Sequence, residues 1–368
     1  MTRLRIGVDA RELLGATTGV GRYLGELLVR WTARADASVR QFLLYAPEPI
    51  PLTFPPRTVD YRILRTGNRP GRGTWWEQMH LRRAVAKDRP EVFFAPAYTA
   101  PLLSAIPLAL TIHDISFVVH PEWFRYREGI RRRWLTRRSA DTAAVVFTDS
   151  EFSRSEIVAH LRIDRNRVKV IPPGLAARHE SAASAQGRQP IVLFVGSIFN
   201  RRRVPDLIAA FAGLARDVSQ ARLVIVGDDR SWPPQSLTDV AARFGIASRV
   251  DFKSYVSDAE LAELYRTASV FAFLSEYEGF GFTPLEALSA GVPIVVADTP
   301  VAREVYGAAA HYVPVGDVAR TTTVLEDLLR GWSNAAEAMR HAPDVLSRYS
   351  WDRAANETLS HIERIAQR

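Results

Sequence analysis

Short β-rich runs alternate with amphipathic helical stretches along the chain, and this alternation limits the possible folds more than any other feature. Leu4–Val8 and Leu108–His113 are examples of expected strands, and Gly21–Ala33 is an example of an expected helix. The alternation restarts after residue 190 with Ile191–Val195, a nearly continuous apolar run that is typical of a strand buried on both faces. Such alternation predicts parallel sheets covered by helices, so the sequence indicates the α/β class with doubly wound sheets.

A linker divides the alternation into two parts. Residues 181–190, SAASAQGRQP, are small and polar and have no apolar periodicity. We therefore expect two Rossmann-like domains, residues 1–182 and 188–350, and a helix in residues 351–368 that packs back on the first domain. Doubly wound sheets bind ligands at the carboxyl ends of their strands, so we expect both domains to face an interdomain cleft that holds the binding site.

The composition excludes several kinds of chemistry. The 368-residue chain has no cysteine, which excludes disulfides, thiolate metal sites and a cysteine nucleophile. No stretch approaches the roughly 20 apolar residues of a spanning helix, and the start of the chain, MTRLRIGVDARELLG, lacks the apolar core of a signal peptide. The histidines have no metal-ligand spacing, and we interpret Asp228–Asp229 as a structural pair. We therefore expect a cytoplasmic protein with no metal and no cofactor.

The positive charge is unevenly distributed along the chain. The formal net charge is +8, and a basic balance fits nucleic acid, an anionic membrane surface or a phosphorylated substrate. Residues 1–186 hold 29 Lys+Arg and 18 Asp+Glu, whereas residues 187–368 hold 19 and 22. The excess is densest in residues 124–138, FRYREGIRRRWLTRR, where aromatic side chains are interleaved with arginines. Such a segment suits an anionic membrane interface, and the alternative is a helix with solvated arginines and core aromatics.

The segment 275–291, SEYEGFGFTPLEALSAG, is the most informative chemically. It follows a buried strand and opens a helix near Thr283–Pro284, where proline suits the first turn. Two glycines let the backbone approach a ligand, and the helix N-terminus favours an anion. Glu278 and Glu286 bracket this loop and are suited to accept hydrogen bonds from ribose or sugar hydroxyls. The alternative is a glycine-rich turn with a glutamate that the helix dipole favours.

These residues resemble those of a known family. The pattern Glu278-x7-Glu286 with its EGFG core, followed by PLEALSAGVPIVVAD, is similar to retaining glycosyltransferases of family 4, which have the GT-B fold. Further segments, among them LTIHDISFVVHPEWF, FVGSIFNRRRVPDLIAAF and DFKSYVSDAELAELY, resemble family segments in the family's order. The resemblance covers essentially the whole chain and implies an enzyme that transfers a hexose from a nucleotide sugar.

The resemblance also implies roles for individual residues in the second domain. Glu278 would contact donor-sugar hydroxyls, and Glu286 would bind the nucleotide ribose. Arg201 and Arg202 would compensate the leaving diphosphate, although relatives usually have lysine at the second position, and whether Arg203 shares this role stays open. Tyr255 and Val256 would line the nucleobase, and the glycine-rich backbone around 279–282 would hold the diphosphate. The full donor-binding set comprises Gly19, Gly21, Gly196, Tyr255, Val256, Gly279, Phe280, Gly281, Phe282, Thr283 and Glu286.

In the first domain, the segment 17–23, TTGVGRY, is a glycine-rich strand-to-helix turn, which alone is a weak phosphate-loop signal. Gly19 and Gly21 are the expected points of close backbone approach to the donor, and Arg22 and Tyr23 are the expected acceptor contacts. The resemblance places His113 against the donor sugar. The expected catalytic residues are therefore His113, Arg201, Arg202 and Glu278.

The expected reaction is hexose transfer with retention, by front-side attack and without a metal. The preferred donor is GDP-mannose, and the expected acceptor is an anionic, lipid-linked or polysaccharide glycan of the cell envelope, reached by peripheral contact with the inner face of the cytoplasmic membrane. Alternatives are transfer from UDP-glucose or another nucleotide sugar to a soluble acceptor, a GT-B nucleotide-sugar epimerase, and a catalytically silent sugar-binding protein. The charge asymmetry and the intact glutamate loop argue against nucleic acid as the partner.

Overall fold

A computed structural model describes residues 3–15, 19–65, 73–102, 105–175, 187–331 and 333–367, without the side chain of Asn334. Residues 17 and 18 of the glycine-rich turn and 181–186 of the expected linker lie outside this description. The chain forms two compact units. The first comprises Met1–Val119, Tyr126–Gly174 and Ser350–Arg368, and the second comprises His120–Arg125 and Leu175–Tyr349.

The first unit contains a seven-stranded parallel sheet in the order β3-β2-β1-β4-β5-β6-β7. Central strands such as VFFA, LALT and VVFT are buried throughout, as continuous apolar runs in parallel sheets should be. The chain reverses its direction of travel across the sheet between β1 and β4, and ligands bind at such a switch point. The strands are β1 (Leu4–Asp9), β2 (Arg40–Ala46), β3 (Val59–Ile63), β4 (Val92–Ala95), β5 (Leu108–Thr111), β6 (Val145–Thr148) and β7 (Val168–Val170).

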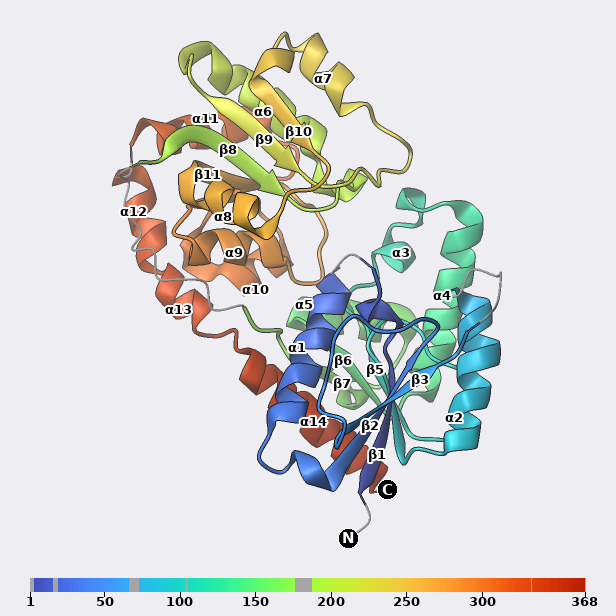
Figure 1. Cartoon of the computed structure of the whole chain (residues 1–368). Helices are drawn as coiled ribbons and strands as arrows, with labels where there is room; N and C mark the ends of the chain where they lie inside the picture. The colour runs from blue at the N-terminus through green and yellow to red at the C-terminus, as the bar shows by residue number, and fades with distance from the viewer. Residues whose placement is uncertain are drawn as a thin grey trace. The chain divides into compact units, whose positions relative to one another are not determined.

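The helices of the first unit include the last helix of the chain. In Figure 1, α14 lies beside α1, and the fully buried Trp31 of α1 donates a hydrogen bond from Nε1 to the carbonyl of Ala355 at 2.8 Å. The helical segment that leads into α2 contains a π-helical stretch, η3 (Trp76–Leu81). The helices are α1 (Gly19–Ala33), α2 (Arg82–Asp88), α3 (Ser116–Val119), α4 (Tyr126–Thr142), α5 (Glu151–Leu161) and α14 (Trp351–Ala366).

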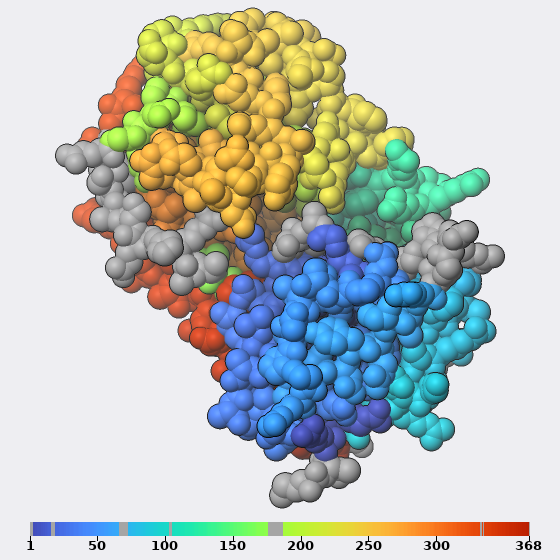
Figure 2. All heavy atoms as spheres, in the orientation of Figure 1, coloured from blue at the N-terminus to red at the C-terminus, as the bar shows by residue number. Residues whose placement is uncertain are grey.

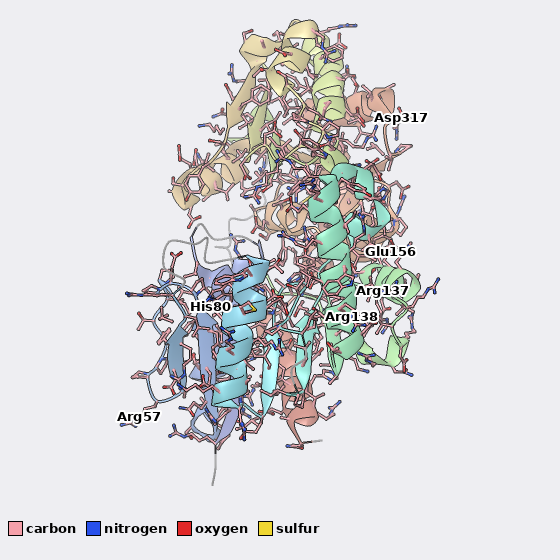
Figure 3. The ribbon with its side chains drawn as sticks, turned by 90° about the vertical axis from the view of Figure 1, so that its right-hand side faces the viewer. Arg57, His80, Arg137, Arg138, Glu156 and Asp317 are labelled. Carbon is pink, nitrogen blue, oxygen red and sulfur yellow. The ribbon has the colours of Figure 1, made fainter. Side chains whose placement is uncertain are left out.

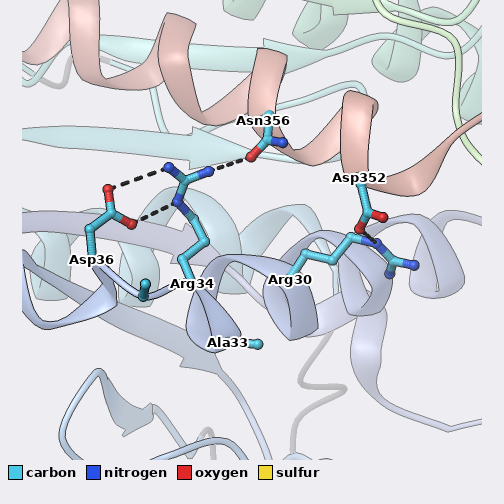
Figure 4. Close-up of a pocket in the computed structure, with 7 residues that line it drawn as sticks. Arg30, Ala33, Arg34, Asp36, Asp352 and Asn356 are labelled. Atoms are coloured by element: carbon cyan, nitrogen blue, oxygen red, sulfur yellow. Dashed lines mark hydrogen bonds and ion pairs between the residues drawn. The ribbon is translucent and has the colours of Figure 1, made fainter.

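A groove of 490 Å³ runs where the end of α1 meets α14, and its charged side chains are paired with one another (Figure 4). Arg30 Nε lies 2.8 Å from Asp352 Oδ1, and Arg34 contacts both Asp36 and Asn356. These side chains connect α1 with α14, which are distant in sequence. Exposed ion pairs of this kind add only a little to the stability of the fold.

The second unit contains a six-stranded parallel sheet in the order β10-β9-β8-β11-β12-β13, with its switch point between β8 and β11. The expected strand Ile191–Val195 forms most of β8, and β13 is an edge strand with the short and mostly half-buried sequence AHYV. The two parallel sheets confirm the expected α/β class. The strands are β8 (Gln189–Val195), β9 (Arg222–Val226), β10 (Val250–Lys253), β11 (Ala268–Phe273), β12 (Ile294–Ala297) and β13 (Ala310–Val313).

Eight α-helices of the second unit lie in the described residues, and several begin with recognisable caps. Ser257 starts α8 with a complete capping box to Glu260, and Thr299 starts α10 by accepting from the Ala302 amide. The helices are α6 (Val204–Asp217), α7 (Leu237–Arg243), α8 (Asp258–Thr267), α9 (Phe282–Ser289), α10 (Pro300–Tyr306), α11 (Val318–Arg330), α12 (Ser333–Arg340) and α13 (Ala342–Leu346).

Arginine side chains satisfy the carbonyls at several helix C-termini. Arg188 donates to the carbonyls of Tyr265 and Ala268 at the end of α8, and to those of Ala290 and Gly291 after α9. Carbonyls at a helix end carry partial negative charge, and one planar guanidinium can bond several of them at once. Arg167, Arg249 and Arg348 act in the same way at the ends of α4, α6 and α10.

We expect replacement of Arg188 by Met to destabilise the second unit by about 2–3 kcal/mol, because partly buried carbonyls lose their donors. Lys should restore only part of this loss, since an ammonium group cannot span both helix ends. Amide hydrogen exchange in α8 and α9 measures the effect, and the exposed Arg243→Met change is the matched control. Equal protection in the Met variant and the control would contradict this role.

Candidate functional site

The switch point of the second sheet brings together residues that follow β8 and residues that follow β11. Arg201 and Arg202 lie in the short helix η6 (Asn200–Arg202) after β8, and Glu278 lies in the loop after β11. Glu278 Oε1 lies 3.0 Å from Arg202 Nε, and Glu278 Oε2 lies 3.5 Å from Arg201 Nη2. Ser275 Oγ donates to Glu278 Oε1 at 2.9 Å. One carboxylate thus meets two guanidinium groups that are 10% and 14% exposed.

The backbone at Gly196 leaves no room for a side chain beside this cluster. Gly196 directly follows β8 with a φ of +143°, and a Cβ there would lie 2.2 Å from Arg202 Nη1. The same guanidinium nitrogen donates to the carbonyl of Ser197 at 2.7 Å. Arg201 Nε donates to the carbonyl of Tyr277 at 3.1 Å. Both arginines are therefore held in place by main-chain carbonyls as well as by Glu278.

The electrostatics of the cluster leave excess positive charge. Burial lowers the pKa of Arg202, and the carboxylate of Glu278 opposes this shift. Two arginines face one glutamate, so the cluster carries a net charge near +1 and is suited to receive an anion. Nearby, burial raises the pKa of Tyr306 well above its ordinary value, so its hydroxyl stays neutral and donates to the carbonyl of Gly281 at 2.9 Å.

Helix α9 begins at this loop, at Phe282. Its N-cap is Gly281, which has a φ of +92° and no side chain to cap the helix, and the first turn has no acidic residue. A Cβ on Gly281 would lie 2.1 Å from Tyr306 Oη, so glycine is required twice over. Among the described residues, the buried Oγ1 of Thr283 has no hydrogen-bond partner. A helix start of this kind is suited to bind a phosphate.

Three further residues that the sequence analysis predicted to bind the donor lie on α9 and after β10. Glu286 lies on α9, where its carboxylate accepts a hydrogen bond from the hydroxyl of the buried Tyr265 at 3.2 Å. Tyr255 is 80% exposed after β10, whereas Val256 is buried. The segment from β10 into α8, coloured light orange, lies on the surface that Figure 2 shows.

Arg203, whose role was open, is bound to carboxylates. It adopts the left-handed conformation with a φ of 50° and pairs with Asp206 and Glu276, at 2.6 and 2.9 Å. These contacts join the loop after β11 to the start of α6. Asp228 pairs with Arg230, and Asp229 accepts from the amide of Ser231, so both carboxylates of the DD pair have local partners.

Tyr277 is a member of the site that the sequence analysis missed. Its ring is buried and packs against His120 and Trp123, at centroid distances of 5.4 and 6.4 Å, and these two rings stack on each other at 3.9 Å. All three residues belong to the second unit, although His120 and Trp123 come from the segment before α4. The motif HPEWF already contained these aromatics, but nothing in the sequence paired them with Tyr277.

In the first unit, His113 follows β5 and has two hydrogen-bond acceptors. Its Nδ1 lies 2.8 Å from Asp149 Oδ2, and its Nε2 lies 3.1 Å from the carbonyl oxygen of Pro96. Because both partners only accept, the doubly protonated ring satisfies both contacts, whereas a neutral ring satisfies one. Burial disfavours this charge, but Asp149 and Asp114 outweigh it and raise the pKa of His113.

The neighbours of His113 include one predicted acceptor residue. Tyr23 is only 3% exposed and meets the His113 ring edge-on at 5.0 Å, while Arg22 is exposed. The contacts of Tyr23 and Arg22 with the acceptor substrate stay predictions. Gly19 and Gly21 lie at the start of α1, and a Cβ on Gly19 would meet nothing within 4 Å.

Asp114 organises the loop after His113. Its Oδ1 accepts from the amide of Ser116 at 2.8 Å, and its Oδ2 accepts from the hydroxyl of Tyr98 at 3.2 Å. Tyr98 follows β4 and adopts a left-handed φ of 59°. Asp114 therefore binds the first amide of α3 and also fixes the ring of Tyr98, which lies 5.9 Å from the ring of His113.

A buried ionic cluster also lies at the carboxyl end of β1, and the sequence analysis did not anticipate it. Arg11 pairs with Asp9 at 2.8 Å and with Glu77, whose Oε2 also accepts from Thr99 Oγ1 at 2.7 Å. Burial raises the pKa of Asp9 to about 6, and Arg11 only partly offsets it. The π-helical segment that carries Glu77 turns this side chain toward β1, and periodicity alone does not predict that geometry.

Comparison with known proteins assigns the chain to a family. Residues 17–178 match the model described as Glycosyltransferase Family 4, and residues 178–342 match the model described as Glycosyl transferases group 1. The chain belongs to glycosyltransferase family 4. The chain is therefore a glycosyltransferase of the hexosyltransferase class, and the resemblance to this family found in the sequence is confirmed.

Two curated relatives and one solved structure are similar to this family 4 chain. It is 28% identical over 265 residues to O-antigen chain mannosyltransferase B of Escherichia coli, covering 68% of each protein. It is 33% identical over 210 residues to GDP-mannose:cellobiosyl-diphosphopolyprenol alpha-mannosyltransferase of Komagataeibacter xylinus, covering 56% of this chain and 53% of that protein. The alignment thus spans about half the length of the latter relative.

The solved structure of WaaG, described as a glycosyltransferase involved in lipopolysaccharide biosynthesis, has a TM-score of 0.75 with this chain. It is 16% identical and covers 97% of this chain and 99% of WaaG, which shows the shared GT-B fold. No helix in the described residues is both long and apolar enough to cross a membrane.

The contacts of His113 predict a pH dependence. Because the folded pKa is raised, the His113–Asp149 pair stabilises the fold fully below about pH 6.5, and this contribution is lost as the pH rises through the raised value. We expect His113→Gln to cost about 1.5–3 kcal/mol at low pH and less at high pH. Unfolding of wild type and variant across pH measures this, with the exposed His341→Gln as control.

A second variant separates the charge from the shape. Asp149→Asn keeps the size of the side chain but removes the charge that raises the pKa of His113, so the imidazole should titrate at lower pH in NMR spectra. A difference in stability that stays constant from pH 5.5 to 9, or an unchanged titration in the Asn variant, would contradict the paired imidazolium.

Proposed function

We propose that this family 4 enzyme transfers a hexose from a nucleotide sugar, preferably GDP-mannose, to a lipid-linked or polysaccharide acceptor with retention of configuration. The observation that carries the proposal is the cluster of Glu278 with two buried arginines at the switch point, beside the uncapped start of α9. The name of the Komagataeibacter xylinus relative, a GDP-mannose:cellobiosyl-diphosphopolyprenol alpha-mannosyltransferase, supports the choice of GDP-mannose and of a lipid-linked acceptor. The Escherichia coli relative, an O-antigen chain mannosyltransferase, supports mannose as the transferred sugar. In this role the enzyme would work in the cytoplasm, at the inner face of the membrane.

The chemical difficulty of the reaction is the departure of a nucleoside diphosphate. Arg201 and Arg202 would stabilise the negative charge as it develops, together with the N-terminus of α9, and Thr283 Oγ1 is placed to hydrogen-bond a phosphate oxygen. The two guanidinium groups are fixed by main-chain carbonyls before the donor binds, so little reorganisation is needed during the reaction. The proposed donor site thus provides preorganised positive charge without a metal.

Glu278 would orient the donor sugar and keep the two arginines apart and in place. Its oxygens already accept from Ser275 and both arginines, which makes this carboxylate a poor nucleophile. Front-side attack fits this arrangement: the acceptor oxygen bonds to the anomeric carbon on the face that the phosphate leaves. The departing phosphate oxygen takes the acceptor's proton, so no separate base is required.

A nucleotide panel tests the proposal directly. We expect GDP to raise the melting temperature more than UDP, and an oligonucleotide to leave it unchanged. GDP-mannose with a polyprenyl-diphosphate-linked acceptor should then give a product whose anomeric configuration, read by NMR, matches that of the donor. Preference for UDP would replace the donor, and an inverted product or epimerised donor would overturn the proposed reaction.

Replacing Arg202 by Ala should lower kcat about 10²–10³-fold, because one preorganised donor to the leaving diphosphate is lost. The KM for the acceptor should change little, since the change acts on the charge that develops in the transition state. Arg202→Lys should recover part of the rate as a point charge. The exposed Arg230→Ala change is the matched control, and an unchanged kcat in the Arg202→Ala enzyme would exclude the role in the leaving group's departure.

A further inference from the structure

Helix α4 presents an exposed face that carries both arginines and large apolar side chains. Tyr126, Ile130 and Trp134 follow one another at four-residue spacing and are 79%, 42% and 57% exposed. A helix places such residues on one face, so these side chains form a stripe. The structure excludes the alternative in which the aromatics of this helix are core residues, because Tyr126 and Trp134 both face solvent. The arginines that flank the stripe and are themselves exposed are Arg127, Arg131, Arg137 and Arg138.

The opposite side of α4 packs on the first unit, so an arginine on that side has a different role from the exposed ones. Arg132 places its guanidinium over the rings of Tyr98 and Phe117, at 4.5 and 4.4 Å, and is thereby fixed to the first unit. Leu135 is buried on the same inner side. The four arginines around the stripe lie on the outer side instead, where two acidic residues of the helix, Glu128 and Asp141, are also exposed. Positive charge therefore prevails on this face.

A groove of 330 Å³ continues the α4 face toward η3 and α2. Its floor and walls are mainly apolar, and Arg82 and Arg131 contribute their side chains to its lining. Trp75, 44% exposed, lies near it and meets the ring of His80 edge-on at 4.6 Å. Figure 3 shows α4 and α2 side by side on one surface of the first unit, with Arg137, Arg138 and His80 labelled. The groove is lined by Thr74, Gln78, Met79, Arg82, Leu102, Arg131, Trp134 and Leu135.

We propose that the α4 face and this groove dock the first unit on an anionic lipid bilayer. The arginines would meet lipid phosphates, the tryptophans would lie at the level of the headgroups, and the groove would take the upper methylenes of one lipid chain. A bilayer supplies negative charge and hydrocarbon within one surface, which is the combination that these side chains need. Nucleic acid supplies phosphates without aliphatic chains and leaves the groove and Ile130 unoccupied.

This docking surface is independent of the transfer reaction, so the two can fail separately. The test uses the full chain with vesicles of phosphatidylcholine alone, or with an added fraction of phosphatidylglycerol. We expect the protein to cosediment only with the anionic vesicles, and added salt to weaken the binding. Inorganic phosphate at the same ionic strength should compete no better than chloride, because a free anion lacks the hydrocarbon.

Paired variants assign the binding to α4. Arg131→Glu with Arg138→Glu should lower partitioning onto anionic vesicles at least about tenfold, as should Tyr126→Ala with Trp134→Ala. The matched control is Arg243→Glu with Phe244→Ala, a pair in the second unit that is also exposed, with Phe244 at 48%. Both α4 variants should keep the wild-type melting temperature and its shift by nucleotide, which shows that a lost vesicle interaction is not lost folding.

Lipids brominated in their acyl chains then locate the contact. They should quench part of the tryptophan fluorescence of the wild type, and Trp134→Phe should remove much of that quenching. Equal binding to neutral vesicles, unchanged binding by both α4 variants, or quenching that is undiminished in the Trp134→Phe variant would each overturn the proposal. Displacement of the protein from vesicles by duplex RNA at equal phosphate concentration would assign the α4 face to nucleic acid instead.

Discussion

The burial of two arginines beside one glutamate is the constraint on which the second unit's site depends. Charges with so little contact with water must be paired and hydrogen-bonded. Glu278 and the carbonyls of Ser197 and Tyr277 meet this requirement, and Gly196 leaves the space that Arg202 fills. The parallel sheet makes the arrangement possible, because β8 and β11 are neighbours whose carboxyl ends deliver both halves of the cluster to one place.

The abundance of arginine has several physical causes in this fold. Some guanidinium groups satisfy helix C-termini, as Arg188 does with hydrogen bonds to four carbonyls and Arg249 with hydrogen bonds to three. Others form the charged cluster at Glu278 or lie on the outer face of α4. The net charge of +8 therefore says little by itself, since a buried guanidinium at a helix end contributes to the count without attracting a partner.

Local pattern was a good guide to the elements and to one side of the site. Apolar runs such as Ile191–Val195 became central strands, and the loop that carries Glu278 and Gly281 does lead into a helix. The partners of these residues were not predictable in the same way. Asp149 lies 36 residues from His113, and only the adjacency of β5 and β6 brings the two together. Tyr277 and the Arg11 cluster were missed for the same reason.

The sequence by itself determined the alternation of strands and helices, the glycine-rich loops and the family, because these depend on residues that are near one another along the chain. Only the tertiary structure decided which charges are buried and which face solvent. The arginines of residues 124–138 show the difference: Arg132 stacks on two rings of the first unit, while Arg131, its neighbour, is exposed. The two arginines are adjacent in α4 and therefore point to different sides of the helix. The way α4 packs on the first unit decides which of them is covered.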